Sequence, residues 1–245
     1  MAGHDTSGPR GRLCHDAHRT GGVAPRPEGI PRPCGGCLLR HRPGALPPAP
    51  RRRAAARRRL DLPERETAVF VGRLDDEKRI GELIRALPLV HRHRDLQLAL
   101  VGTGQQRADL RRLAEELGVA DRVRFLGFVP DADLSSAYAA ADLFAIASVA
   151  ELQSIATLEA MSAGLPVVAA DALALPHLVR EGENGSLFPP GDIEALARCL
   201  EGVLASEQRR AAMGEASRRI AQTHDQQRSL RRFEEIYRAI RPRRR

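Results

Sequence analysis

Two basic residues close to a glycine are the first candidates for binding chemistry in this sequence. Arg73 and Lys78 lie five residues apart, directly after Gly72 and a short apolar run. Two cations around a turn can hold an anion such as a diphosphate, and the glycine lets the backbone approach it closely. The alternative is that both cations are solvated and that Asp75 or Asp76 caps the next helix.

Two acidic residues later in the chain are the second set of candidates. Glu151 and Glu159 are eight residues apart, which in one helix spans roughly 800°, so a single helix would not direct both carboxylates to one point. If Ser154 caps a helix, Glu151 lies in the preceding loop and the free N–H groups of the first turn face the space between the acids. A helix N-terminus is a ready anion site. The alternative for Glu159, which stands among apolar residues, is a structural pair with an Arg.

The elements that must position these residues are those of an α/β domain with a doubly wound, Rossmann-like parallel sheet. Short apolar runs alternate with segments of helical period, and the runs are nearly continuous, as strands buried on both faces require. In such a sheet the ligand lies at the carboxyl ends of the strands, where the candidate residues stand. The predicted strands are Ala68–Val71, Leu98–Val101, Val123–Leu126, Leu143–Ile146, Pro166–Ala170 and Ser186–Phe188.

Apolar residues at helical spacing predict the helices that cover this sheet. One stripe lies within residues 80–90 and includes Pro88, which should kink the helix. A second stripe within residues 110–117 is followed by Gly118, a residue type that favours helix C-termini. Later stripes predict a helical C-terminal end.

A glycine pair after the second predicted strand resembles the start of a dinucleotide fingerprint. The pair is Gly102-Thr103-Gly104, but Arg107 stands where the third glycine would be. No acidic residue follows the next strand, where a ribose ligand would be expected. The evidence for nicotinamide binding is therefore weak.

Taken together, the motifs resemble the C-terminal donor-binding domain of family 4 retaining glycosyltransferases of the GT-B fold. The resemblance extends from about residue 66 to residue 240. It rests on the combination, which is far more specific than any single motif. The matching segments are Gly72-Arg73-Leu74 with Lys78, the two acids with seven residues between them, Glu159-Ala160-Met161-Ser162-Ala163-Gly164-Leu165-Pro166-Val167-Val168, Glu183-Asn184-Gly185 and Pro189-Pro190-Gly191-Asp192.

The resemblance implies transfer of a sugar from a nucleotide diphosphate sugar to an acceptor, with retention. The donor is a substrate, so no separate cofactor and no metal are implied. Two cations and a helix N-terminus would neutralise the departing diphosphate, which is electrostatic stabilisation of a leaving group. The first acid of the motif would contact hydroxyls of the transferred sugar. The residues that match these catalytic positions are Glu151, Arg73 and Lys78.

The resemblance also implies a set of donor-binding residues. The second acid of the motif binds the ribose, a glycine lies close to the phosphates, and backbone N–H groups at the start of the following helix contact the diphosphate. The stretch 125–129 matches the place where main-chain groups hold the base. The residues that match these binding positions are Glu159, Gly102, Gln153, Ser154, Phe128 and Val129.

Three segments depart from the family pattern. Leu152-Gln153-Ser154 stands where many members have Gly-Phe-Gly, beside the sugar. The segment 172–177 replaces a Gly-Gly pair followed by Glu in a loop on the phosphate side. Arg79 occupies a position that is often glycine.

Length is a further departure, because the family fold has two lobes and the first one binds the acceptor. Only about 65 residues precede the donor lobe here, too few for a second sheet domain. We therefore expect a donor lobe that is incomplete without an acceptor lobe. The alternative is a non-catalytic nucleotide-sugar-binding subunit that docks on a partner chain supplying the acceptor site.

The basic residues of this protein are concentrated at its ends. The formal net charge is +8, yet residues 1–60 alone carry thirteen Arg and three acids. This segment has no aromatic residue and nine Pro, so we expect residues 1–62 to be disordered, 63–240 to form the glycosyltransferase domain, and 241–245 to be a basic tail. The first segment is also compatible with a truncated or frame-shifted product of GC-rich DNA.

The composition of the chain ends raises two other functions, a zinc site and contact with nucleic acid or a membrane. Cys34 and Cys37, with Cys14, His18 and His41, do not have the spacing of a usual zinc finger, so no metal site is expected. The Arg clusters allow salt-sensitive, unspecific contact with nucleic acid or peripheral contact with an anionic membrane, but no aromatic residue is available nearby for base stacking. No apolar run is long enough to span a bilayer or to form a secretory signal, which predicts a cytoplasmic protein.

Overall fold

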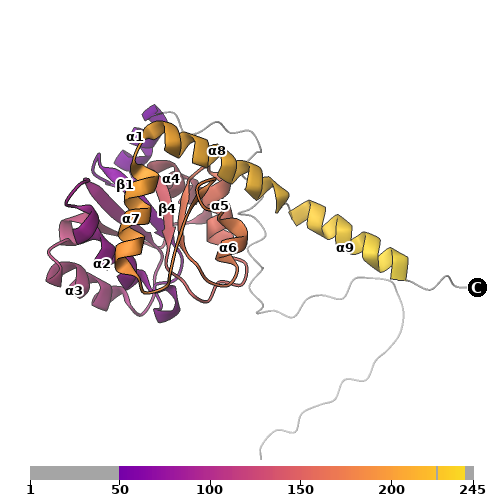
Figure 1. The fold of residues 1–245 in the computed structure, drawn as a ribbon, viewed down its shortest axis with the longest axis horizontal. Helices are drawn as coiled ribbons and strands as arrows, with labels where there is room; N and C mark the ends of the chain where they lie inside the picture. The colour runs from indigo at the N-terminus through magenta and orange to yellow at the C-terminus, as the bar shows by residue number, and fades with distance from the viewer. Residues whose placement is uncertain (1–49, 225, 241–245) are drawn as a thin grey trace, which may run out of the picture. The chain divides into compact units, whose positions relative to one another are not determined.

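The structure, a computed structural model, describes residues 50–224 and 226–240 (Figure 1). The predictions for residues 1–49 and for the basic tail 241–245 fall outside these residues. The cysteines and histidines of the zinc alternative fall outside them as well.

Six strands form one parallel sheet, which confirms the predicted α/β, doubly wound fold. Their order is β3-β2-β1-β4-β5-β6. β1 and β2 start earlier than predicted because they pair along their whole length, from Glu66 and Leu96 to Val71 and Val101. β5 starts one residue later than predicted, after Pro166, which has no N–H to donate. The strands are β1 (Glu66–Val71), β2 (Leu96–Val101), β3 (Val123–Gly127), β4 (Leu143–Ile146), β5 (Val167–Ala170) and β6 (Gly185–Phe188).

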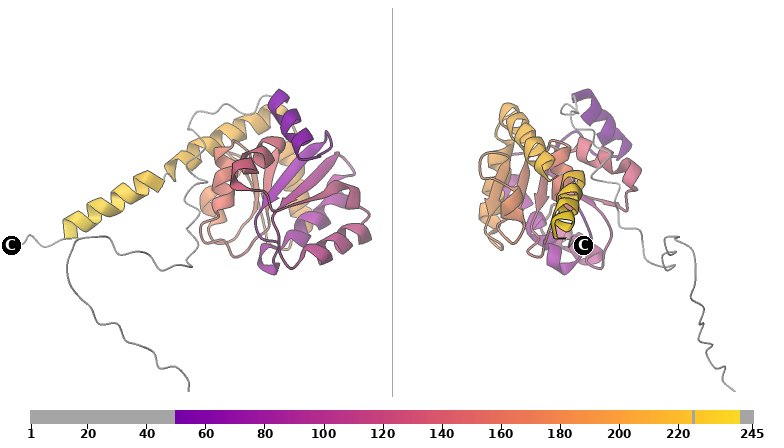
Figure 2. Two further views of the ribbon diagram at one scale, coloured as in Figure 1. Left: turned by 180° about the vertical axis from the view of Figure 1, so that it is seen from behind. Right: turned by 90° about the vertical axis from the view of Figure 1, so that its right-hand side faces the viewer.

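Helices cover both faces of the sheet. Parallel strands are joined by right-handed crossovers, so the reversal of strand order after β3 moves the next helices to the opposite face. α2 packs against α3 and α7 on one face, and α4 and α5 contact the central strands on the other (Figures 1 and 2). These helices are α2 (Ile80–Val90), α3 (Arg107–Glu116), α4 (Asp131–Ala140), α5 (Ile155–Ser162) and α7 (Ile193–Leu204).

Shorter and terminal helices complete the described residues. α8 contacts α5 and α7, and α6 contacts β5. The predicted helical C-terminal end is confirmed by α8 and α9. The bounds are η1 (Asp76–Lys78), η2 (Ala120–Arg122), α6 (Leu175–Leu178), α8 (Glu207–Thr223) and α9 (Gln226–Ile240).

The core consists of the apolar residues that identified the strands. All four residues of β4 are buried, and Phe70, Phe144 and Phe188 are fully enclosed. Pro88 lies inside α2, as predicted. Gly118 has a φ of 67°, its N–H donates to Glu115, and the next N–H donates to Ala114. This pair of bonds is the Schellman motif, so the predicted helix end is confirmed.

The prediction of a disordered segment up to residue 62 is wrong for its last part. Residues Pro50–Arg59 form the helix α1, which packs against α4. Ala56 and Arg57 of this helix and Leu62 after it are buried. The composition of the segment did not predict this helix, because the partner that orders it lies far along the chain.

That partner is Asp142, a carboxylate at the start of β4. It binds Arg57 and Arg53, with N–O distances of 2.7 Å in both cases. It also accepts the backbone N–H of Thr67 at 2.8 Å, and Arg57 donates to the carbonyl of Ala140. Since every charge in this network is paired or hydrogen-bonded, the arginines of α1 can be buried without a prohibitive desolvation cost.

The network predicts that Asp142→Asn is severely destabilising. The amide cannot balance the buried Arg57 guanidinium, and removing one partner of a buried ion pair costs about 3 kcal/mol. We expect the free energy of unfolding in urea to fall by about that amount.

Glu64→Gln is the matched control, because Glu64 also binds Arg57 but its side chain is 60% exposed. Its loss should cost less than about 0.5 kcal/mol. Equal effects of the two substitutions would contradict the assigned role of Asp142.

Candidate active site

The candidate site lies where the strand order reverses, between β1 and β4. These strands are neighbours, with Ala68 beside Leu143 and Val69 beside Phe144. The chain leaves them toward opposite faces of the sheet, and the carboxyl edge at such a reversal is where open α/β sheets commonly bind ligands. The loops that follow these strands carry the predicted cations and the first predicted acid.

Lys78 and Glu151 meet between these two loops. The Lys78 ammonium donates to Oε1 of Glu151 at 2.8 Å, although the two residues are 73 positions apart. Their side chains are only 15% and 13% exposed. A second carboxylate, that of Glu77, lies 3.4 Å from the same ammonium. The fold therefore brings together a cation and an acid that were predicted from separate motifs.

Arg73 lies on the same loop but binds its own neighbours. Its guanidinium is 2.6 Å from Asp75 and 3.1 Å from Glu77, and the side chain is 70% exposed. Exposed pairs of this kind contribute little to stability. An incoming anion could therefore displace them at low cost.

The N-terminus of α5 follows the loop after β4, and Ser154 is its N-cap residue. This is the position that the capping hypothesis required, so Glu151 lies in the preceding loop and Glu159 in the helix. The side chain itself does not cap the helix, because the Ser154 hydroxyl lies 2.7 Å from the hydroxyl of Thr157 and accepts no backbone N–H. Ser154 has a φ of 48°, whereas a capping serine is usually extended. The first-turn N–H groups, from Ile155 to Thr157, have no acceptor within the helix and can meet an anion. Gln153 is exposed beside them.

Glu159, the second acid, is held by a tyrosine and not by an arginine. The hydroxyl of Tyr138 donates to Oε2 of Glu159 at 2.9 Å. Within residues 50–224 and 226–240, the partner found for this carboxylate is the tyrosine, so the alternative of an arginine partner is not supported. Sequence reasoning missed Tyr138, and no spacing rule links it to an acid 21 positions away.

Gly102 marks the point where the loops after β1 and β2 touch. Its φ is 133°, and a Cβ at this position would lie 1.9 Å from the carbonyl oxygen of Gly72. Its own N–H donates to Gly127 at the end of β3. Only a glycine satisfies both constraints, so this residue sets the approach of three strand ends.

Phe128 and Val129 follow β3, at the edge of the sheet. Phe128 is 76% exposed, and Val129 is partly buried against the core. The exposed ring and the neighbouring backbone are accessible from solvent at the carboxyl edge of the sheet.

The backbone at Arg79 shows why glycine is common at this position in the family. Its φ is 48°, in the left-handed region that favours glycine, which accounts for the glycine often found at this position. Its guanidinium pairs with Glu82, whose other carboxylate oxygen accepts the N–H of Gly191 at 3.2 Å. The pair therefore joins the start of α2 to the loop after β6.

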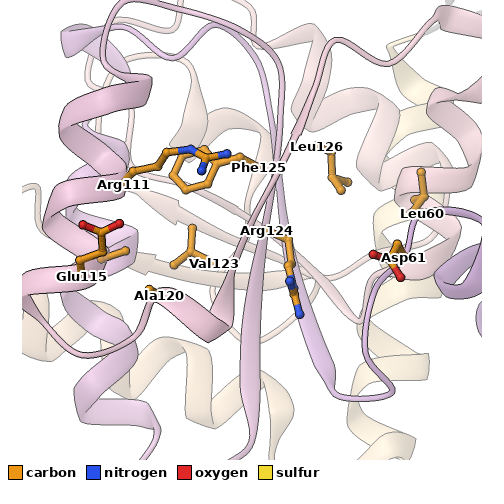
Figure 3. A pocket seen from close by; sticks show the side chains of 10 residues that line it. Leu60, Asp61, Arg111, Glu115, Ala120, Val123, Arg124, Phe125 and Leu126 are labelled. Carbon is orange, nitrogen blue, oxygen red and sulfur yellow. The ribbon is translucent and has the colours of Figure 1, made fainter.

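A cavity of about 350 Å³ lies elsewhere, along the open edge of β3 (Figure 3). Arg111 lies over the ring of Phe125 at 4.9 Å on one side, and Leu60 and Asp61 lie on the other. Its lining includes Phe125 and Leu126 from the stretch 125–129, but none of the residues predicted singly for the catalytic and donor-binding positions.

The described residues contain no group of three or more His, Cys, Asp or Glu that could hold a metal. Among these residues Cys199 is a free cysteine, and burial raises the pKa of its thiol. A half-buried thiol of raised pKa that contacts the carbonyl of Leu187 suits a packing role. None of the helices seen in 50–224 and 226–240 is long and apolar enough to cross a membrane.

The crowding at Gly102 predicts that Gly102→Ala is strongly destabilising. The new Cβ would displace the Gly72 carbonyl and add backbone strain, costing at least about 2 kcal/mol. Gly118→Ala is the matched control, because Gly118 also has a positive φ but a Cβ there meets nothing within 4 Å. In urea, Gly102→Ala should have a much lower free energy of unfolding than Gly118→Ala. The reverse order of the two free energies would disprove the crowding argument.

Comparison with known proteins places the chain in a family. The family model for glycosyl transferases group 1 matches residues 52–220. The chain is 37% identical over 182 residues to the GDP-mannose-dependent alpha-(1-6)-phosphatidylinositol monomannoside mannosyltransferase of Mycolicibacterium smegmatis, covering 71% of this chain and 48% of that protein. It is 39% identical over 199 residues to the D-inositol 3-phosphate glycosyltransferase of Salinispora tropica, covering 76% and 41%. The chain spans less than half the length of these relatives.

Solved structures show the same similarity. Sucrose-phosphate synthase of Thermosynechococcus elongatus matches with a TM-score of 0.68 and 31% identity, over 80% of this chain and 49% of that one. Anabaena HepE in complex with UDP matches with a TM-score of 0.65 and 30% identity, over 71% and 49%. With its 3-2-1-4-5-6 sheet and its matched motifs, the chain belongs to the group 1 glycosyl transferases of the GT-B fold.

Proposed function

We propose that this chain is the donor lobe of a retaining hexosyltransferase of the family 4 type. In this proposal it binds a nucleotide diphosphate sugar, from which the hexosyl group passes to an acceptor. The observation that carries the proposal is the 2.8 Å contact of Lys78 with Glu151 beside the N-terminus of α5, at the reversal of strand order.

The diphosphate would be stabilised by three positive features. Lys78 is nearly buried, so its charge is less screened by water than that of a surface lysine. Arg73 can leave its exposed acidic neighbours, and the first-turn N–H groups of α5 add the positive end of a helix dipole. Together they would lower the energy of the leaving diphosphate without a metal.

The remaining predicted residues would hold the other parts of the donor. Glu151 would accept hydroxyls of the transferred sugar, and Glu159 those of the ribose. Gly102 would let the phosphates approach the backbone, with Gln153 and Ser154 on the opposite side. Phe128 and Val129 would contact the base. The donor is itself the substrate, so this proposal includes no separate cofactor.

The names of the comparison proteins indicate which nucleotide bases and sugars should be tested. One relative is named for its dependence on GDP-mannose, and HepE is described in complex with UDP and glucose. Both UDP and GDP are therefore the appropriate probes. The acceptor lobe would be supplied from outside residues 50–240, since the chain spans less than half of its relatives. The isolated chain should bind donor weakly and turn over poorly, because chemistry needs a positioned acceptor.

The direct test is calorimetric titration with UDP, GDP, UDP-glucose and GDP-mannose. At least one should bind the chain at millimolar or lower concentration, and the double variant Arg73→Ala, Glu159→Ala should lose that affinity while its thermal unfolding stays cooperative. Arg112→Ala, Glu116→Ala is the control, since it removes the same charges from an exposed pair on α3. Absence of binding by the unmodified chain would refute the proposal.

The Lys78–Glu151 pair generates a second prediction. Glu151→Gln releases Lys78 from its carboxylate, so the nucleoside diphosphate alone should bind several-fold more tightly. The nucleotide sugar should lose the additional affinity that its sugar hydroxyls provide. Titration of both ligands against both proteins separates the effects, and a parallel loss for the two ligands would argue against this division of roles.

A second candidate function is a non-catalytic binding subunit that docks on a partner chain. It is favoured by four large apolar side chains of α9 that are exposed to solvent: Leu230, Phe233, Ile236 and Tyr237. Their spacing puts them on one side of the helix, and a stripe of this kind is typical of a surface that packs against another one. Sugar transfer by the purified chain without any added protein would exclude this alternative.

A further inference from the structure

One buried hydroxyl contacts α5 at two points. The Tyr138 hydroxyl of α4 lies 2.9 Å from Oε2 of Glu159 and 3.4 Å from the carbonyl oxygen of Ala156. Both acceptors belong to α5. Glu159 carries the carboxylate that is proposed to bind ribose. Ala156 lies in the first turn of the helix, whose N–H groups are proposed to face the diphosphate.

The position of this hydroxyl is fixed by the core. Tyr138 is only 3% exposed. Its ring lies 6.4 Å from that of Phe144 on β4, with the two planes inclined by 51°. A buried aromatic side chain has little rotational freedom, so the sheet, through Phe144, determines where the phenol meets α5.

A phenol suits this carboxylate better than a cation would. An ionised carboxylate can accept several hydrogen bonds through two oxygens. The phenol O–H donates one hydrogen bond but carries no positive charge, so it does not cancel the negative charge of the carboxylate. It therefore orients Glu159 through Oε2 and leaves Oε1 for other donors.

We infer that Tyr138 is a positioning residue of the donor site. Its hydroxyl holds the carboxylate of Glu159 so that the remaining oxygen accepts hydrogen bonds from the ribose of the nucleotide. The carboxylate is thus ordered before the donor arrives, which lowers the entropy lost on binding. This inference rests on the proposed function, since it requires that a nucleotide binds at this edge of the sheet.

The test compares Tyr138→Phe with the unmodified chain on two ligands. The first ligand is UDP or GDP, whichever binds the unmodified chain, and the second is its 2′,3′-dideoxy analogue, which lacks the hydroxyls that Glu159 would bind. Tyr138→Phe should weaken the binding of the ribonucleotide by about 10- to 100-fold, the effect of one hydrogen bond to a charged group. Affinity for the dideoxy analogue should change by less than about 2-fold, because Tyr138 acts only through the hydroxyls that this ligand lacks.

Two variants separate positioning from general destabilisation. Phe188→Leu removes a fully enclosed ring from β6, two strands away from β4, so it should lower the melting temperature. It should leave unchanged the ratio of the affinity for the ribonucleotide to the affinity for the dideoxy analogue. Glu159→Gln should reduce that ratio at least as far as Tyr138→Phe does. A ratio unchanged by Tyr138→Phe, or equal weakening of both ligands, would overturn the inference alone. Failure of the unmodified chain to bind either nucleotide would overturn the proposed function and this inference with it.

Discussion

The reversal of strand order between β1 and β4 is the constraint on which the candidate site depends. Adjacent parallel strands normally send their helices to the same face, and here they send them to opposite faces. Side chains from distant parts of the chain can therefore meet at the carboxyl edge, between the loops that follow the two strands. Lys78 and Glu151, 73 positions apart, form their ion pair only because of this topology.

The two edges of the sheet use charge in opposite ways. At the amino edge, Asp142 is enclosed by Arg53, Arg57 and a backbone N–H, and such a network is expensive to disturb. At the carboxyl edge, Arg73 is exposed and pairs with acids of its own loop, so its partners can be exchanged at low cost. The fixed network joins α1 to the domain, whereas the exchangeable pairs lie where a charged ligand is proposed to enter.

The two acids of the site also differ in whether an anionic ligand could exchange their partners. Glu151 is paired with a cation that an anionic ligand would attract, so its contact is expected to change on binding. Glu159 is held by the neutral donor Tyr138, which a diphosphate would not attract. One carboxylate can thus respond to the ligand while the other stays oriented for it.

The strands and several site residues could be predicted from the sequence, because burial and backbone conformation constrain the residue types locally. Strands buried on both faces need continuous apolar runs, so the six strands could be recognised, and β4 was placed with its observed bounds. Gly118 could be singled out because a helix C-terminus favours a residue of positive φ. Gly102 was predicted from the family resemblance, and the structure adds that a Cβ there would meet the Gly72 carbonyl. Arg73, Lys78 and Glu151 could be proposed because they follow strands, and Glu159 because it is an acid among apolar residues of a predicted helix.

Contacts between distant residues could not be derived in this way. The helix α1 was missed because Arg57 becomes a buried residue only when Asp142, 85 positions later, supplies its counter-charge. The hydrogen bond of Tyr138 to Glu159, the internal pairing of Arg73 and the left-handed backbone of Ser154 carry no periodic or compositional signal. The sequence by itself therefore determined the elements and the residue types at their ends. The tertiary structure decided which of those side chains share a partner, because desolvation and hydrogen-bond geometry act between residues that only the folded chain brings together.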